Sequence, residues 1–253
     1  MTTTTPVRQA DRRLALRLAL GLVAMFGLAV PFLILALLVR SRWDPLLDLD
    51  TTVADRLHQV ALHNHWLVTL LQTLSTVFDP LVFRMVATIV ALGLLHAGRR
   101  RLGAWTLVTT WGAALLGVLL KEVVDRARPD LLDAVATAPG RSFPSGHALG
   151  SVVGSAVLLM LAMPLLHRPW RGIAVVAAVI VPLSVGFARI GLGVHYLSDV
   201  VAGEVLGLAW VIIMAAAFHA WRRDVGLPPA APTEAEPEIA EGIPEPAKDS
   251  PRP

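Results

Sequence analysis

The sequence predicts an all-α polytopic membrane protein with six transmembrane helices and an outer-face loop that carries two interfacial helices. The chain of 253 residues is 55% hydrophobic and 16% charged, whereas a soluble domain carries about a quarter charged residues. Its apolar residues also gather in long blocks, and a helix needs about 20 such residues to cross the hydrocarbon core. The sequence has no cysteine, which excludes a disulfide framework, a thiolate metal site and a cysteine nucleophile.

Six apolar stretches are long enough to form the spans. The first starts too late and runs too long for a cleaved signal peptide, and no small-residue cleavage site is obvious after it. We therefore interpret it as a permanent span. In chain order the six stretches cover Leu18–Val39, about Pro80–Ala97, Leu102–Leu120, Ala148–Leu166, Gly172–Ala188 and Val200–Trp221.

Four arginine clusters orient these spans. The clusters precede span one and follow spans two, four and six, so six spans place all four on one side of the membrane. The positive-inside rule makes that side cytoplasmic. We expect both termini in the cytoplasm and the loops around 40–79, 121–147 and 189–199 on the extracytoplasmic face. The arginines are Arg8, Arg12, Arg13, Arg17, Arg99, Arg100, Arg101, Arg168, Arg171, Arg222 and Arg223.

The first outer loop, about 40–79, is long enough to hold structure of its own. Thr51–His63 and Asn64–Val77 have the pattern of amphipathic helices at the interface, the second of which can dip into the membrane. Asp48, Asp50 and Thr52 fit the Asp-x-Asp-x-Thr pattern of haloacid dehalogenase phosphatases. That chemistry needs a soluble α/β domain and bound magnesium. We interpret the pattern as a coincidence at a helix N-cap.

The predicted organisation is one membrane domain between two terminal segments. Residues 1–17 form a cytoplasmic segment, 18–223 the six-span domain and 224–253 a disordered, acidic, proline-rich cytoplasmic tail. From Gly226 onward the tail holds six acidic residues, two basic residues and eight prolines, so it cannot bury enough apolar surface to offset its ordering entropy. The remaining arginines flank apolar blocks, which favours a role in topology over nucleic-acid binding.

Ionisable residues collect at the outer ends of spans three to six. Such groups are costly at a membrane edge unless they are paired or hydrated, so a cluster of them indicates a functional site. Three basic residues, two histidines and one carboxylate are expected at a single depth on one face: Lys121, Arg128, Arg189, His147, His195 and Asp199.

The spacing of the basic residues suits phosphate binding. Lys121 and Arg128 are seven residues apart and share a helical face if the helix continues that far. Arg189 adds a planar fork for two phosphate oxygens. Ser145 and Gly146 lie at the N-terminus of span four, where backbone N–H groups and the helix dipole favour an anion.

The spacing of the histidines suits nucleophilic and acid–base catalysis. His195 and Asp199 are four residues apart at the start of span six. The carboxylate can accept from one imidazole nitrogen and leave the other unprotonated as a nucleophile. His147 then remains to protonate the leaving oxygen.

These residues form three motifs that together resemble the type 2 phosphatidic acid phosphatase superfamily, which includes vanadium haloperoxidases and glucose-6-phosphatases. The resemblance runs from about span three to span six, and it implies a six-helix fold and catalysis without a metal or other cofactor. One position departs, because Ala188 stands where the family usually has serine, which removes one possible hydroxyl contact to phosphate. The motifs are Lys121-x6-Arg128-Pro129, Pro144-Ser145-Gly146-His147 and Arg189-x5-His195-x3-Asp199.

The resemblance also implies a role for each site residue. His195 attacks phosphorus to give a phosphohistidine, and Asp199 orients it. His147 acts as general acid on the leaving oxygen and then as base for the hydrolytic water. The remaining residues bind the phosphoryl oxygens: Lys121, Arg128, Ser145, Gly146 and Arg189.

We therefore expect a metal-independent phosphatase whose partners are the bilayer and a lipid phosphate or pyrophosphate. The resemblance implies the undecaprenyl pyrophosphate, phosphatidylglycerophosphate or phosphatidate class, and the composition indicates a bacterial plasma membrane. The fourteen residues between Pro129 and Pro144 are expected to form a lid or rim. Two alternatives stay open: a phosphatase for a soluble phosphate ester, and a non-catalytic lipid-phosphate binder or transporter. The sequence specifies neither the lipid nor the oligomeric state.

Other polar residues near the spans receive structural interpretations. Asp79 and Arg84 lie on either side of Pro80 at the mouth of span two, where they can pair with each other or touch substrate, and we favour a structural role. We interpret the remaining histidines of the outer loop, His58, His63 and His65, as interfacial residues and not as a metal site.

Overall fold

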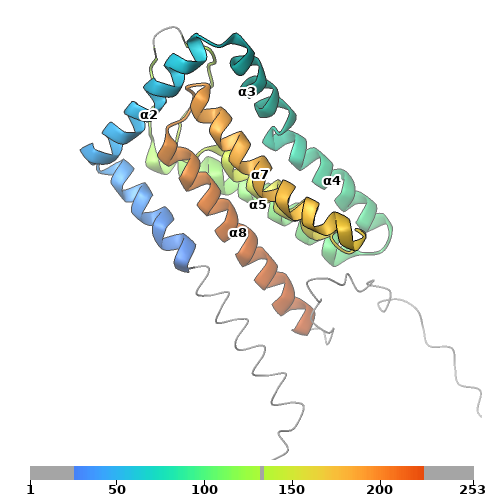
Figure 1. Cartoon of the computed structure of the whole chain (residues 1–253). Coiled ribbons are helices and arrows are strands. Elements are labelled where there is room, and N and C mark those ends of the chain that lie inside the picture. Colours follow the sequence, from blue (N-terminus) through green and yellow to red (C-terminus); the bar gives the residue numbers. More distant parts are fainter. Residues whose placement is uncertain (1–25, 132–133, 225–253) are drawn as a thin grey trace, which may run out of the picture.

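The computed structural model describes residues 26–131 and 134–224, with side chains described up to residue 218. The predicted N-terminal segment, the start of span one and the tail beyond Asp224 lie outside these ranges. All regular elements in the described ranges are helices (Figure 1). They are Phe26–Arg40, α2 (Asp44–Leu62), α3 (His65–Val77), α4 (Pro80–His96), α5 (Arg100–Val124), α6 (Gly146–Ala162), α7 (Arg168–Gly191) and α8 (Leu197–Asp224).

Four stretches of these helices are long and apolar enough to cross a membrane: His65–His96, Arg100–Val124, Arg168–Gly191 and Leu197–Phe218. A fifth is present if Phe26–Arg40 and α2, which meet at a bend of 91°, count as one span. α6 is apolar but has 17 residues, or about 25 Å of helix, against a hydrocarbon core of about 30 Å. The chain is thus a multi-pass helical membrane protein, and the count of six spans stays a prediction.

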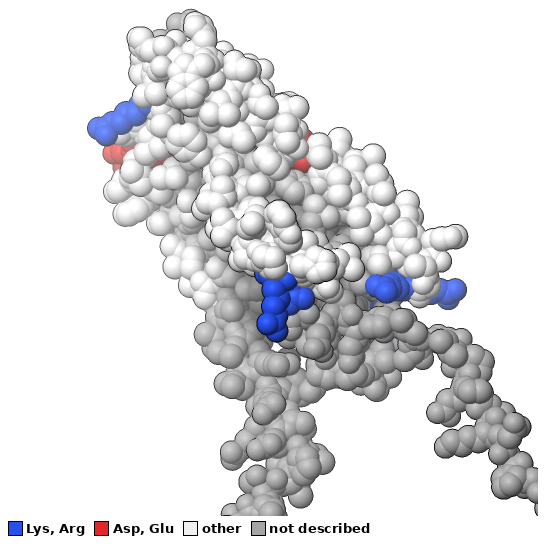
Figure 2. All heavy atoms as spheres, turned by 45° about the vertical axis from the view of Figure 1, so that its right-hand side comes forward, with Lys and Arg blue, Asp and Glu red and all other residues white. Residues whose placement is uncertain are grey.

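The surface of the bundle suits contact with lipid. Figure 2 shows a broad uncharged surface on one face, with basic side chains near its ends. Large apolar side chains are exposed along several helices, for example Ile89 on α4, Leu115 on α5 and Val176 on α7. Soluble monomers rarely expose so much apolar surface, which is instead suited to contact with the hydrocarbon core of a bilayer.

The outer loop differs from its predicted form. α2 begins at Asp44, so Asp48, Asp50 and Thr52 lie inside the helix and the N-cap interpretation is wrong. Asp50 is fully buried and faces the other helices. α3 and α4 together form one candidate span of 32 residues, so the second helix of the loop belongs largely to the apolar bundle.

α6 packs against α4, α5, α7 and α8, which makes it the central helix of the domain. Glycines allow the closest approaches. A Cβ on Gly203 of α8 would lie 2.6 Å from the carbonyl oxygen of Ser145, and one on Gly154 would lie 2.4 Å from the ring of Phe83 in α4. Small residues let membrane helices pack closely, and here they bring the start of α6 beside the first turns of α8.

The C-terminal ends of α5 and α7 and the N-terminal ends of α6 and α8 meet at one end of the bundle (Figure 1). α5 ends at Val124 because Asp125 adopts a left-handed conformation with φ of 54°. The prediction that Lys121 and Arg128 share a helical face is therefore wrong. Arg128 lies in the α5–α6 loop, residues 125–145, and reaches the site from there.

Candidate active site

His195 lies between a carboxylate and a guanidinium. Its Nδ1 is 3.4 Å from Oδ2 of Asp199 and its Nε2 is 3.1 Å from Nη1 of Arg128. A guanidinium can only donate, so Nε2 is the acceptor and the proton lies on Nδ1. Burial lowers the pKa of His195 to about 4, and Asp199 opposes that shift. The ring is therefore neutral at physiological pH, with an unprotonated Nε2.

Asp199 is held by more than His195. Its carboxylate is fully buried, Oδ2 also accepts from the backbone N–H of Tyr196 at 3.0 Å, and Oδ1 accepts from Nη1 of Arg126 at 2.7 Å. A buried carboxylate stays charged only when such partners replace water. The predicted pair of His195 and Asp199 is therefore present and rigidly oriented.

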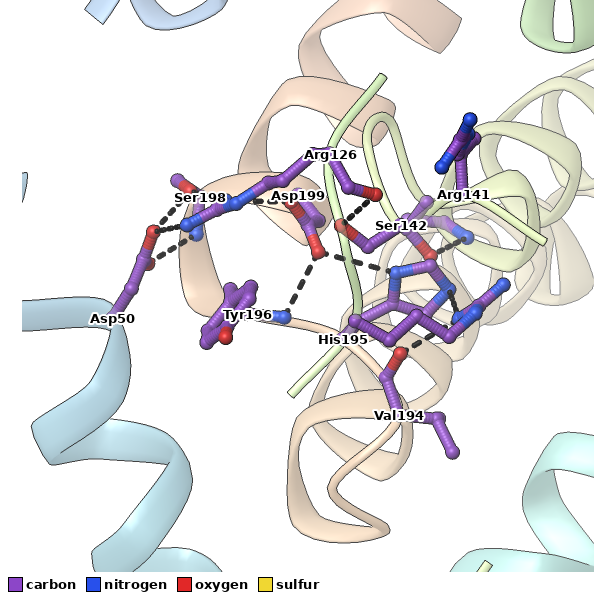
Figure 3. A network of polar contacts seen from close by, with 12 residues as sticks. Asp50, Arg126, Arg141, Ser142, Val194, His195, Tyr196, Ser198 and Asp199 are labelled. Carbon is purple, nitrogen blue, oxygen red and sulfur yellow. Dashed lines mark hydrogen bonds and ion pairs between the residues drawn. The ribbon is translucent and has the colours of Figure 1, made fainter. Parts of the chain in front are cut away.

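Arg126 extends this network to the outer loop, as Figure 3 shows. Its Nη2 donates to Oδ2 of Asp50 at 2.7 Å, and its Nη1 also donates to Oγ of Ser198 at 2.7 Å. Asp50 in turn accepts from the backbone N–H of Ser198 at 2.9 Å and from its hydroxyl at 2.5 Å. The guanidinium also lies 4.1 Å from the ring centroid of Tyr196. α2 is thus joined to the segment that carries His195 and Asp199.

The predicted phosphate-binding cations Arg128 and Lys121 hold the α5–α6 loop. Arg128 donates to the carbonyl oxygens of Pro139, Gly140 and Val194 at 3.1, 3.1 and 2.7 Å. Lys121 donates to the carbonyl oxygen of the loop residue Arg141 at 2.7 Å. These contacts hold residues 139–141 of the loop against two of the predicted site cations.

Arg189 reaches the site from the end of α7. Its Nη1 donates to Oγ of Ser75 in α3 at 2.7 Å. Its Nε is buried and has no hydrogen-bond partner among the described residues. The positive charge of Arg189 contributes to the lowered pKa of His195. Ala188, which precedes it, is fully buried in an apolar cluster with Leu71, Leu192 and Val194.

The second motif forms the first turn of α6. Ser145 is the N-cap, because its Oγ accepts from the backbone N–H of Ala148 at 3.4 Å. Its own backbone N–H donates to the carbonyl oxygen of Asp199 at 2.9 Å, which ties α6 to α8. Gly146 and His147 follow, and both line a cavity of about 300 Å³ with Lys121.

His147 has a partner that the sequence did not predict. Its Nε2 lies 3.1 Å from Oδ2 of Asp79. Asp79 also caps α4, since its Oδ1 accepts from the backbone N–H of Leu81 at 2.7 Å. The predicted structural role of Asp79 is therefore present but incomplete. In the described residues, these contacts and the shared cavity bring the predicted site residues together at the ends of α5, α6, α7 and α8: Lys121, Arg128, Ser145, Gly146, His147, Arg189, His195 and Asp199.

Four residues of the site were not predicted: Asp50, Ser75, Asp79 and Arg126. Asp50 lay in the Asp-x-Asp-x-Thr pattern that we set aside, and Arg126 lies two residues before the motif arginine. Both are charged residues beside apolar blocks, and buried charge requires a partner. The sequence therefore indicated that Asp50 and Arg126 each need a charged or polar partner, but it did not indicate which residue that partner is.

Together the helices and the histidine–aspartate pair define a multi-pass membrane protein with a buried catalytic-type pair and a cluster of cations at one end of the bundle. The family model of the PAP2 superfamily matches residues 102–223. A decaprenylphosphoryl-5-phosphoribose phosphatase of Mycobacterium tuberculosis is 35% identical over 146 residues, which cover 49% of this chain and 75% of that protein. The chain belongs to the PAP2 superfamily.

Other relatives differ in the lipid that their names give. Phosphatidylglycerophosphatase B of Bacillus subtilis is 38% identical over 97 residues, 37% of this chain and 47% of that protein. An undecaprenyl-diphosphatase of Sulfolobus acidocaldarius is 33% identical over 130 residues, 49% of this chain and 58% of that protein. The chain spans about half the length of the first curated relatives that it matches.

The fold has a solved counterpart. The crystal structure of a transmembrane PAP2 type phosphatidylglycerolphosphate phosphatase from Bacillus subtilis superposes with a TM-score of 0.68 at 22% identity, over 80% of this chain and 98% of that chain. This likeness supports the helical membrane fold.

Proposed function

We propose that this protein hydrolyses a lipid phosphate or pyrophosphate at the extracytoplasmic face of a bacterial plasma membrane, through a phosphohistidine. The observation that carries the proposal is the orientation of His195. The carboxylate of Asp199 accepts a hydrogen bond from Nδ1–H, and Nε2 is unprotonated beside Arg128. When a phosphoryl oxygen replaces Nε2 as the acceptor of Arg128, the freed lone pair of this oriented imidazole is placed to attack phosphorus.

The proposed reaction has two displacements at phosphorus. Nε2 of His195 forms a bond to phosphorus while the bond to the leaving oxygen breaks, and His147 donates a proton to that oxygen. His147 then takes a proton from water, whose oxygen attacks phosphorus and releases His195 and inorganic phosphate. Asp199 stabilises the ring while it carries positive charge.

The phosphoryl oxygens gain negative charge in both transition states, and preorganised cations stabilise that charge. We assign this role to Lys121, Arg128 and Arg189, together with Ser145 and the backbone N–H of Gly146. The buried Nε of Arg189 has no partner among the described residues, so it is available to an oxygen of the substrate.

A lipid substrate is favoured by where the cavity lies. It extends from Lys121 and His147 between α4, α5 and α6, and its walls are largely apolar. Several relatives bear names that give phosphatidylglycerophosphate, lipid A, undecaprenyl diphosphate or a decaprenyl lipid. The arginine clusters support an outward-facing site by the positive-inside rule.

Phosphate release from detergent-purified protein tests this function. The substrates are phosphatidate, phosphatidylglycerophosphate, an isoprenyl diphosphate and a soluble ester, each with a metal chelator present. We expect release from at least one lipid, loss by at least about three orders of magnitude in His195→Ala, and no change in His63→Ala, which alters an exposed histidine directly after α2. Faster release from the soluble ester, or binding of lipid without release, would contradict the proposal.

A further inference from the structure

Arg84 is a cation within the apolar part of the bundle that the proposed mechanism does not use. It lies in the second turn of α4, inside the candidate span His65–His96. Its Nε is buried and has no hydrogen-bond partner among the described residues. A charged residue at this depth is costly, and it usually faces a polar cavity or a ligand.

Arg84 lines the same cavity as the active site. Lys121, Gly146 and His147 form one part of the lining, and Arg84 and Thr110 another. The rest of the lining is apolar apart from Asp79, and it includes the small residues Ala113, Ala114, Gly117 and Gly150. The cavity of about 300 Å³ therefore runs from Lys121 and His147, the proposed general acid, to a second cation.

The depth of Arg84 follows from how α4 and α6 meet. Pro80 lies against Gly150 and Phe83 against Gly154, by the distances that a Cβ at each glycine would have. Gly154 is eight residues beyond Gly146, so at 1.5 Å per residue this contact lies about 12 Å further along α6. The guanidinium of Arg84 lies over the ring of Trp111, which is ten residues before Lys121 and therefore about 15 Å away from it along α5. The guanidinium of Arg84 is therefore well separated from the scissile phosphate, but a single substrate can still contact both.

The side chain of Arg84 is supported from one side. Its guanidinium lies 5.6 Å from the ring centroid of Trp111 in α5. Trp111 is itself fixed, because its Nε1 donates to Oγ1 of Thr88 at 3.0 Å. A cation–π contact holds a guanidinium while leaving its N–H edge free to donate. Asp79 lines the same cavity, and its charge acts on Arg84. Its carboxylate oxygens contact His147 and the backbone N–H of Leu81, and no hydrogen bond to Arg84 is present among the described residues.

We propose that Arg84 binds a second, non-scissile phosphate of the substrate, joined to the scissile phosphate through a polar spacer such as glycerol or a sugar. This inference rests on the proposed function and narrows its substrate class. A directly linked diphosphate would keep its second phosphate next to His147, and a phosphatidate has no second phosphate. A spaced diester phosphate is the group that combines negative charge with this separation.

The test compares Arg84→Gln with the wild type on three substrates in mixed micelles. We expect kcat/KM for phosphatidylglycerophosphate to fall about ten- to a hundredfold, the range for one charged hydrogen bond. The value for phosphatidate should change less than about twofold, and an isoprenyl diphosphate should behave like phosphatidate. Arg84→Lys keeps the charge and should recover part of the loss, and Arg56→Gln, at an exposed position of α2, should match the wild type.

The outcomes separate this proposal from the proposed function. Equal losses on all substrates in both Arg84 variants, or a loss confined to the isoprenyl diphosphate, would overturn the second-phosphate site while leaving the phosphatase intact. A wild type that releases no phosphate from any of the three lipids would overturn the proposed function itself. If thermal unfolding in detergent shows that Arg84→Gln is not folded, the same comparison is made with Arg84→Lys. Replacing a purely structural arginine would lower kcat/KM for all substrates alike.

Discussion

Arg126 contacts Asp199 on the oxygen that His195 does not use. Its Nη1 lies 2.7 Å from Oδ1, whereas Nδ1 of His195 lies 3.4 Å from Oδ2. The same guanidinium reaches Asp50 in α2 at 2.7 Å. The orientation of the proposed nucleophile thus depends on an arginine that has no direct contact with it among the interactions described.

Arg126→Lys should therefore lower kcat more than it raises KM. A lysine ammonium cannot fork between two carboxylates as a guanidinium does, so Asp199 loses a fixed partner while the phosphate-binding cations stay in place. We expect kcat to fall at least about tenfold, in the range of effects that misorientation of a catalytic group produces. Steady-state kinetics on the lipid substrate with the highest activity measures the changes in kcat and KM separately.

The matched control is Arg56→Lys, at an exposed position of the same outer region, which should leave both parameters unchanged. Arg126→Met leaves two buried carboxylates without their cation and should cost about 3–5 kcal/mol of stability. A rise in KM with unchanged kcat in Arg126→Lys would show that Arg126 binds substrate and does not position Asp199.

Asp79→Asn tests whether the contact with His147 serves the proton transfer. An asparagine at the N-cap still accepts from Leu81 N–H, so α4 should remain intact. The amide no longer stabilises a protonated imidazole by charge. The basic limb of the pH–rate profile should then move to lower pH, and kcat near neutral pH should fall about tenfold or more.

Asp48→Asn is the control for this change, because Asp48 is an exposed carboxylate of α2. A lower kcat with an unmoved basic limb would assign Asp79 to the fold of the α4 N-terminus and not to the acid–base chemistry of His147.

The pH dependence of His195 should be displaced to the acid side. Burial lowers its pKa to about 4, below the ordinary value of about 6.5. Since the neutral ring is the nucleophile, activity is lost only as pH falls through the lowered pKa. In the pH profile of kcat/KM, the acid limb that reports His195 should lie near pH 4. This limb should not move when the substrate is replaced by one whose phosphate has a different pKa. A substrate-independent limb near pH 6.5 would contradict this assignment.

Much of the helical architecture could be predicted, because the bilayer imposes a length and an apolar composition on each span. The predicted spans Leu102–Leu120, Gly172–Ala188 and Val200–Trp221 lie within α5, α7 and α8. At the site, α7 ends just after Arg189, and α6 and α8 begin beside the motif histidines, as the motifs suggested. The end of α5 was not predictable from spacing alone. The left-handed Asp125 stops the helix before Arg128, and a seven-residue interval is equally compatible with a helix that continues.

The supporting contacts of the site could not be predicted, because they join residues that are distant in the sequence. Asp50 meets Arg126, Ser75 meets Arg189, and Asp79 meets His147 only after α2, α3 and α4 have packed against the later helices. A pattern along the chain identifies a group that needs a partner, but the partner is decided by tertiary packing.

Ser75→Ala removes one such partner and should weaken substrate binding. Ser75 lies on α3 and accepts from Nη1 of Arg189 at 2.7 Å, so it fixes the direction in which this arginine presents its remaining N–H groups. Without it, Arg189 keeps its charge but loses a hydrogen bond worth about 1.5–3 kcal/mol when one partner is charged. We expect a fall in kcat/KM of about tenfold, carried mainly by KM, because a mobile cation costs entropy to reorder around phosphate. Ser41→Ala, at an exposed serine outside the site, is the control. An unchanged kcat/KM in Ser75→Ala would mean that Arg189 is held in place by the protein without its hydroxyl partner, and that the α3 contact contributes nothing to phosphate binding.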